Sequence, residues 1–189
     1  MRWIIATIIF SGIYHRILFA APNPPPAADI SMSEIFLHEP ASAKKVLGHW
    51  AAIASPNVPL PKVSCDNMSR RERLTLVFHN GDVQGSFNEF IVEPTATEAA
   101  PAKCHLEHIN RFISGKGLAL GITTTEVQRL LGAPHQRIGP DGGDVTYQYR
   151  IDNFADSDFL KFYGLPVYFG EYRFRQGRLT YLHVGFEYP

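Results

Sequence analysis

The residues best suited to chemistry in this sequence are two cysteines, Cys65 and Cys104, and eight histidines. The stretch CHLEH brings Cys104, His105 and His108 close together in sequence, as a metal site requires. The run HLEHINRF that follows alternates like a β-strand, which would direct His105 and Glu107 to one face and His108 to the other. Too few ligands then share a face to hold zinc, so we expect no metal site and no cofactor.

Covalent catalysis would need an activated nucleophile. In KVSCDN, Cys65 is not placed at a helix N-terminus or beside a fixed cation, the settings that lower a thiol pKa. The sequence has no G-x-S-x-G elbow, and GKGLALG lacks the spacing of a phosphate-binding loop. These patterns favour a protein that is not an enzyme. A small secreted hydrolase or metal-binding protein without a recognisable motif is the alternative.

The N-terminus has the layout of a secretory signal peptide, with Arg2, an apolar run over residues 3–14 and small residues ending at Ala21. We therefore predict a signal peptide over residues 1–21 and a periplasmic or secreted protein. Because Arg16 interrupts the pattern, an uncleaved anchor or a buried N-terminal segment is the alternative. Neither cysteine follows the apolar run, so no lipid anchor is evident.

Residues 22–30, PNPPPAADI, are too rich in proline for regular hydrogen-bonded structure and predict a stiff linker.

In an oxidising compartment, the even number of cysteines predicts one disulfide between Cys65 and Cys104. It would close a loop of roughly 40 residues. Two unpaired buried thiols are the alternative.

The segment TTTEVQRLLGAP predicts a short helix with strong end signals. Thr123 can cap its N-terminus, and Glu126 three residues later completes a capping box. Apolar residues follow at spacings of three and four, Gly132 supplies a stop and Pro134 prevents continuation. A helix of about two turns is marginal in water, so it must pack onto another element.

Strand signals dominate the remainder of the C-terminal half. DVTYQYRI alternates between apolar and polar residues, and YFGEYRFRQGRLTYLHVGFEY predicts two strands joined at Gln176 and Gly177. Tyr147, Tyr149, Phe174 and Phe186 are expected in the core. The opposite phase carries the side chains expected to face outward: Gln148, Arg150, Glu171, Arg173, Arg175, Tyr181, His183 and Glu187.

Similar patterns occur twice along the chain. KKVLG echoes QRLLG, and FHNGDV echoes FRQGRL. The second echo has a constant register, relating Phe78 to Phe174 and Phe90 to Phe186. An internal repeat accounts for this register, and chance similarity between amphipathic hairpins is the alternative.

The stretch RFISGKGLALGITTTEVQRLLGAP, followed by a tyrosine-rich strand and an F-x-x-G-x-L hairpin, resembles the SmpA/OmlA (BamE-type) outer-membrane assembly lipoproteins and the related β-lactamase inhibitory protein fold. The resemblance covers residues 112–189, and residues 31–111 more faintly. It implies an α+β fold of two tandem units, 31–111 and 112–189, each with short helices packed on one face of an antiparallel β-sheet. It also implies a non-enzymatic protein that presents a sheet face or loops to another protein.

The charge balance points to the same kind of partner. The chain has 18 basic and 18 acidic side chains, so it offers no basic stripe for nucleic acid and no polybasic segment for a membrane. The outward phase combines tyrosine, arginine and histidine with carboxylates, a composition typical of protein interfaces. We expect it to bind another protein, either an envelope component or a secreted enzyme. An ordinary solvated sheet face with cross-strand ion pairs is the alternative.

Overall fold

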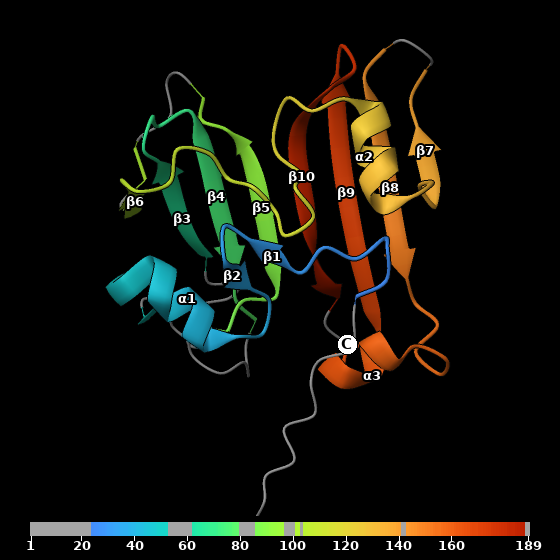
Figure 1. Ribbon diagram of the computed structural model, residues 1–189, viewed down its shortest axis with the longest axis horizontal. Helices are drawn as coiled ribbons and strands as arrows, with labels where there is room; N and C mark the ends of the chain where they lie inside the picture. Colours follow the sequence, from blue (N-terminus) through green and yellow to red (C-terminus); the bar gives the residue numbers. More distant parts are fainter. Residues whose placement is uncertain are drawn as a thin grey trace, which may run out of the picture.

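The computed structural model describes residues 24–52, 62–79, 86–96, 101–102, 104–140 and 143–187, and most of its regular structure is β-strand (Figure 1). The signal peptide predicted over residues 1–21 lies outside the described residues. The elements are, in chain order, β1 (Ser31–Met32), β2 (Ile35–Phe36), α1 (Pro40–Leu47), η1 (Gly48–Ala52), β3 (Lys62–Asn67), β4 (Glu72–Val77), β5 (Glu89–Pro94), β6 (Cys104–Leu106), α2 (Thr124–Leu131), β7 (Gln136–Ile138), β8 (Val145–Ile151), α3 (Asp158–Tyr163), β9 (Val167–Arg175) and β10 (Arg178–Glu187).

One large sheet organises the molecule. Its strand order is β6-β3-β4-β5-β10-β9-β8-β7, and β1 pairs with β2 in a separate two-stranded sheet. Every neighbouring pair in the large sheet is antiparallel except β3 and β6, which are parallel. The large sheet is therefore mixed.

The expected fold, two tandem units of short helices on an antiparallel sheet, is wrong. The structure is mostly β, and its eight-stranded sheet is continuous. The physical reason is the pairing of β5 with β10, in which Leu182 lies opposite Val92 and Val184 opposite Phe90. Two separate sheets would each expose an edge of unpaired backbone groups, and this pairing satisfies both edges.

The internal echo falls on two hairpins that lie side by side in this sheet. Phe78 directly follows β4 and Phe90 lies in β5, while Phe174 and Phe186 belong to β9 and β10. All four side chains are at most 2% exposed, so the echoed phenylalanines belong to one shared core.

The predicted helix is confirmed as α2. The hydroxyl of Thr123 accepts from the backbone N–H of Glu126 (3.2 Å), and the Glu126 carboxylate accepts from the backbone N–H of Thr123 (2.7 Å). Gly132 ends the helix with a positive φ of 83°. The Tyr149 hydroxyl donates to the Gly132 carbonyl (2.9 Å), which ties the helix end to β8. Val127 is completely buried, so the short helix is held by packing.

The predicted hairpin of β9 and β10 is also confirmed, with positive φ at both Gln176 and Gly177. A bulge follows, because Leu179 lies opposite Phe174 while Tyr181 already lies opposite Arg173. The extra residue, Thr180, shifts the phase of β10 by one position. Leu179 and Leu182 are consequently both buried, and Tyr181 points to the other side.

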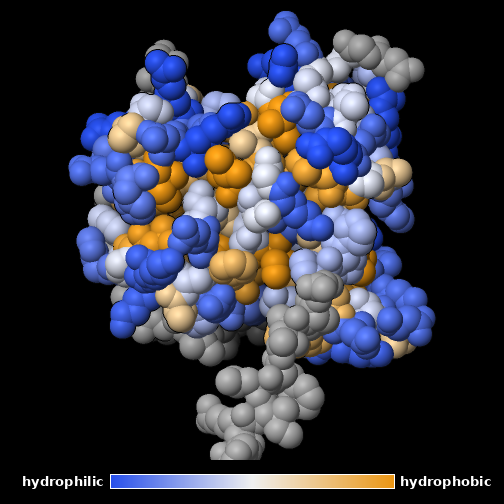
Figure 2. Space-filling model, viewed as in Figure 1, coloured by the Kyte–Doolittle hydropathy of each residue, from blue (hydrophilic) through white to orange (hydrophobic). Residues whose placement is uncertain are grey.

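The two faces of the large sheet differ. Helices α1 and α2 and the β1–β2 ribbon lie over one face, here called the inner face, and none of the described helices lies over the other, the outer face (Figure 1). The inner face carries buried aromatic side chains, among them Tyr149, Tyr172 and Phe186. Viewed from the inner side, apolar residues at the molecular surface are interspersed with hydrophilic ones (Figure 2).

The strand expected over HLEHINRF ends earlier than the alternation suggests. Strand β6 stops at Leu106, and the backbone N–H of Ile109 donates to the Leu106 carbonyl (3.1 Å), closing a turn. The alternation therefore does not place His105 and His108 on the two faces of one strand. Local turn closure overrides the sequence pattern here, directly after the three residues of β6, all of which pair with β3.

The predicted disulfide between Cys65 and Cys104 is present and buried. The two cysteines are register partners of β3 and β6, so the bond joins the parallel strand pair directly. Next to it, Arg73 donates two hydrogen bonds to the Asp66 carboxylate (2.7 and 3.1 Å), and the backbone N–H of Ala102 donates a third (2.8 Å).

Within the described part of the chain, no helix is long and apolar enough to cross a membrane.

Replacing both cysteines by alanine should lower the free energy of unfolding by about 3 to 4 kcal/mol, because the unfolded chain regains the freedom of a loop with a sequence separation of 39 residues. Urea denaturation of the oxidised protein and of the double variant measures this difference. The same double variant should be insensitive to a reductant that destabilises the parent protein. A reductant effect of equal size in both proteins would contradict a stabilising disulfide.

Candidate functional site

The structure places the eight predicted partner-binding residues on the outer face. Gln148 and Arg150 come from β8, Glu171, Arg173 and Arg175 from β9, and Tyr181, His183 and Glu187 from β10. Strand register aligns them in rows across the sheet. One row runs Gln148, Glu171, His183, Ile91 and Thr75, and so continues onto β5 and β4.

Glu89 holds two imidazoles at the centre of this face. One carboxylate oxygen lies 2.6 Å from Nε2 of His183, and the other lies 2.7 Å from Nε2 of His79. Burial by itself raises the pKa of Glu89, but the hydrogen bonds from His183 and His79 outweigh it and hold the pKa below its usual value. The Phe169 ring packs edge-on against His183 with centroids 4.8 Å apart. Glu89 therefore fixes the position of both imidazoles.

A glycine makes room for this arrangement. Gly185 of β10 is the register partner of Glu89. A Cβ atom at Gly185 would lie 2.4 Å from the Asn88 carbonyl oxygen and 2.7 Å from Cγ of Glu89. Because both contacts are closer than real Cβ atoms approach, a larger residue would force β5 and its carboxylate away from His183.

Ion pairs also position the arginines of the outer face. The Arg173 guanidinium pairs with Glu171 and lies over the Tyr181 ring, 4.2 Å from its centroid. Arg150 forms a two-pronged pair with Glu187 on the other side of β9. Burial raises the pKa of the Tyr181 hydroxyl, which stays neutral at physiological pH. Neighbouring side chains thus compensate these charges before any partner is bound.

Sequence reasoning missed four residues of this face: His79, Glu89, Ile91 and Phe169. Alternation along β5 offers a signal, because the buried Phe90 and Val92 imply that Glu89 and Ile91 point the other way. The sequence holds no signal, however, that β5 lies beside β10. Glu89 and His183 are separated by 94 residues along the chain.

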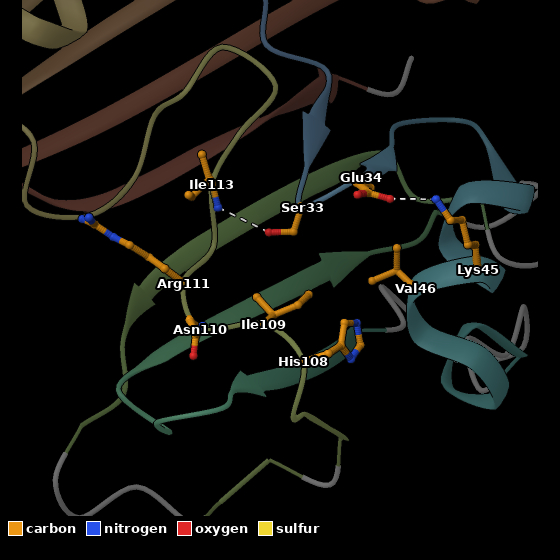
Figure 3. Close-up of a pocket in the computed structure, with 9 residues that line it drawn as sticks. All are labelled: Ser33, Glu34, Lys45, Val46, His108, Ile109, Asn110, Arg111 and Ile113. Carbon is orange, nitrogen blue, oxygen red and sulfur yellow. Dashed lines mark hydrogen bonds and ion pairs between the residues drawn. The ribbon is translucent and has the colours of Figure 1, made fainter.

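A groove of about 560 Å³ lies elsewhere, between α1, the β1–β2 turn and residues 108–113 (Figure 3). Its polar groups do not converge on a common point. Glu34 and Lys45 bind each other (2.7 Å), while the Arg111 side chain extends away from the rest and lies 3.5 Å from Glu72. Both Glu34 and Lys45 are more than two-thirds exposed, so the pair adds little electrostatic binding power. This groove has no arrangement of groups suited to a particular ligand.

Comparisons with known protein families, with curated proteins and with solved structures find no match for this chain. The resemblance to the SmpA/OmlA lipoproteins and the absence of enzymatic activity therefore stay predictions.

Among the described residues, no cluster of histidine, cysteine, aspartate and glutamate is arranged to hold a metal ion. Cys65 and Cys104 are joined, so neither is a free thiol in this structure.

Replacing Glu89 by glutamine should destabilise the protein by about 1 to 3 kcal/mol at pH 7, because an uncharged amide cannot accept from both imidazoles as the carboxylate does. The pKa of Glu89 is lower in the folded state than its ordinary value of 4.5. The Glu89 carboxylate therefore contributes fully to the free energy of unfolding above pH 4.5. This contribution is lost as the pH falls through the lower pKa that Glu89 has in the folded state. Urea unfolding of both proteins between pH 7 and pH 3 should show the two stabilities converging.

The matched control is Glu187→Gln, which removes a carboxylate from an exposed ion pair on the same face. Its effect should stay below about 1 kcal/mol at every pH. A loss at Glu187 as large as that at Glu89, or a difference at Glu89 that grows in acid, would show that the carboxylate does not organise this face.

Proposed function

We propose that this chain is a non-enzymatic, exported protein that binds another protein through the outer face of its large sheet. One observation carries the proposal: the centre of that face holds aromatic and imidazole side chains that their neighbours already keep in place, since His183 is hydrogen-bonded to Glu89 and the ion-paired Arg173 covers the Tyr181 ring. The His183 ring packs edge-on against both Phe169 and Tyr181 there. Side chains held in one conformation lose less entropy on association, which favours binding.

The chemistry of the face favours a protein over other partners. Its arginines are already paired with carboxylates, and the whole chain has no net charge. A nucleic acid or an anionic membrane would require an excess of unpaired cations. Tyrosine, arginine and phenylalanine surrounded by paired charges are instead typical of protein interfaces. The metal-binding alternative finds no support among the described residues.

Export is part of the same proposal. The buried disulfide between Cys65 and Cys104 fits an oxidising compartment, and the first 21 residues resemble a signal peptide. We place the protein in the periplasm or outside the cell. Its partner is then either an envelope component or a secreted enzyme, and recovery with outer membrane or in the soluble exported fraction distinguishes the two.

Photo-crosslinking tests the face directly. A benzophenone amino acid in place of Phe169 should crosslink a partner in native envelope or culture extract. The same group in place of Arg129, an exposed residue of α2 over the inner face, should crosslink it far less. Equal yields from the two positions would show that the outer face has no binding preference.

Tyr181→Ala should abolish crosslinking of the same partner from Phe169 and change the free energy of unfolding by only about 1 kcal/mol, because Tyr181 is half-buried on the outer face. Phe186→Ala, which empties the inner core, should cost about 3 to 5 kcal/mol. If Tyr181→Ala folds normally and still crosslinks as well as the parent protein, the outer face is a solvated surface.

A further inference from the structure

The N-terminal strap, residues 24–37, is packed against the inner face rather than extended as a linker (Figure 1). Its first residues form no helix or strand, as expected of a proline-rich segment, but Ala28 and Asp29 are almost completely buried. The Lys116 ammonium donates to the carbonyls of Pro25 and Pro26 (3.1 and 2.9 Å). The strap is therefore a component of the folded core.

Asp29 is the most unusual residue of the strap. Its backbone N–H donates to the Tyr168 hydroxyl (2.7 Å), which in turn donates to the Asp29 carbonyl (2.9 Å). The residue is only 2% exposed, and its carboxylate oxygen Oδ2 has no hydrogen-bond partner among the described residues. A buried charge without full hydrogen bonding is costly.

We propose that the strap is a pH-dependent latch, closed when Asp29 is protonated and released in a fraction of molecules when Asp29 is ionised. This inference does not depend on the proposed function, because the strap and Asp29 belong to the inner side of the sheet.

The groups that face Asp29 explain why its charge is poorly supported. Tyr168 and Tyr172 approach from β9 and are uncharged, since burial raises the pKa of each hydroxyl above its ordinary value. Segment 114–118 contributes the Ser114 hydroxyl together with the backbone N–H and the ammonium of Lys116. The ammonium is already held by the proline carbonyls. Ser31, within the strap itself, adds a backbone hydrogen bond.

Burial outweighs these groups and raises the pKa of Asp29 from 3.8 to about 6. Asp29 binds its proton more tightly when the strap is closed than when it is open. Closure of the strap is therefore most favourable below pH 3.8 and weakens as the pH rises through 6. With these two values, the equilibrium constant for opening should increase about twenty-five-fold between pH 4.5 and pH 7.5.

Opening of the strap breaks fewer backbone–backbone hydrogen bonds than opening of a central strand. Beyond the β1–β2 ribbon, the described residues give the strap three such bonds to distant parts of the chain, those of Ser33 with Ile113, Gly115 with Ser31 and His38 at its end with Phe87. Side chains add the two bonds between Asp29 and Tyr168 and the two from Lys116 to the proline carbonyls. Strand β9, in contrast, pairs along most of its length with both β8 and β10. The strap also buries Met32, Ile35 and Leu37 in the core, so its opening is a rare event, but its shorter backbone ladder lets it open at lower free energy than the central strands.

Hydrogen exchange of the full chain, resolved by residue, measures the latch. After correction for intrinsic exchange rates, the amides of Asp29, Ser33 and Gly115, each bonded between the strap and another segment, should exchange faster than those of β9. Their opening constant should rise about twenty-five-fold from pH 4.5 to pH 7.5. In Asp29→Asn, which keeps the shape without the charge, the change with pH should fall below twofold. If the strap and β9 share one opening constant, or if Asp29→Asn keeps the pH dependence, the latch is refuted.

Lys116→Met provides a second variant if Asp29→Asn does not fold. Loss of the two hydrogen bonds to the proline carbonyls should raise strap opening at both pH values. Loss of the nearby cation should leave the pH dependence at least as steep, because the cation lowers the pKa of Asp29. Strap opening that is unchanged in this variant, or that loses its pH dependence while Asp29 is intact, would overturn the proposal.

Discussion

The pairing of β5 with β10 is the interaction on which the other features of this protein depend. It aligns Val92 with Leu182 and Phe90 with Val184, and so unites two hairpins into one sheet with one core. The same backbone ladder places Glu89 opposite Gly185, within reach of His183. Without this pairing there would be neither a continuous inner face for the helices nor a continuous outer face for a partner.

The two faces use polar groups in opposite ways. On the outer face, charges are half-exposed and compensated by neighbours, as in the pairs Arg150–Glu187 and Arg173–Glu171. Such pairs contribute little stability, but they hold side chains in a fixed arrangement. On the inner face, Asp29 is deeply buried and incompletely bonded, and its pKa is raised to about 6. Because burial disfavours the charged form, the protonation of the Asp29 carboxyl group is coupled to the packing of the strap.

His38, a half-buried residue directly after the strap, is a second titratable group of this region. Burial lowers its pKa to about 4, and its ring packs against Tyr163 and Phe186. A lowered histidine pKa destabilises the fold as the pH falls from 6.5 towards 4, which is the reverse of the effect of Asp29 over nearly the same range. The two residues therefore oppose each other in global stability.

The sequence by itself determined the features that depend on neighbouring residues. The capping box of Thr123 and Glu126, the turn at Gln176 and Gly177, and the alternation in β8 all arise from contacts within a few positions. The phase of the terminal hairpin followed from the same alternation. The disulfide was predictable because only two cysteines are present.

Only the tertiary structure decided which strands are neighbours. Backbone groups at strand edges are alike in every strand, so alternation cannot show that β5 pairs with β10 or that β3 and β6 run parallel. For that reason the fold class was mispredicted and Glu89 was missed. The burial of Asp29 was likewise invisible, because it requires Tyr168, which is 139 residues away. Non-local packing, rather than local preference, sets the exposure of such a residue and hence its charge.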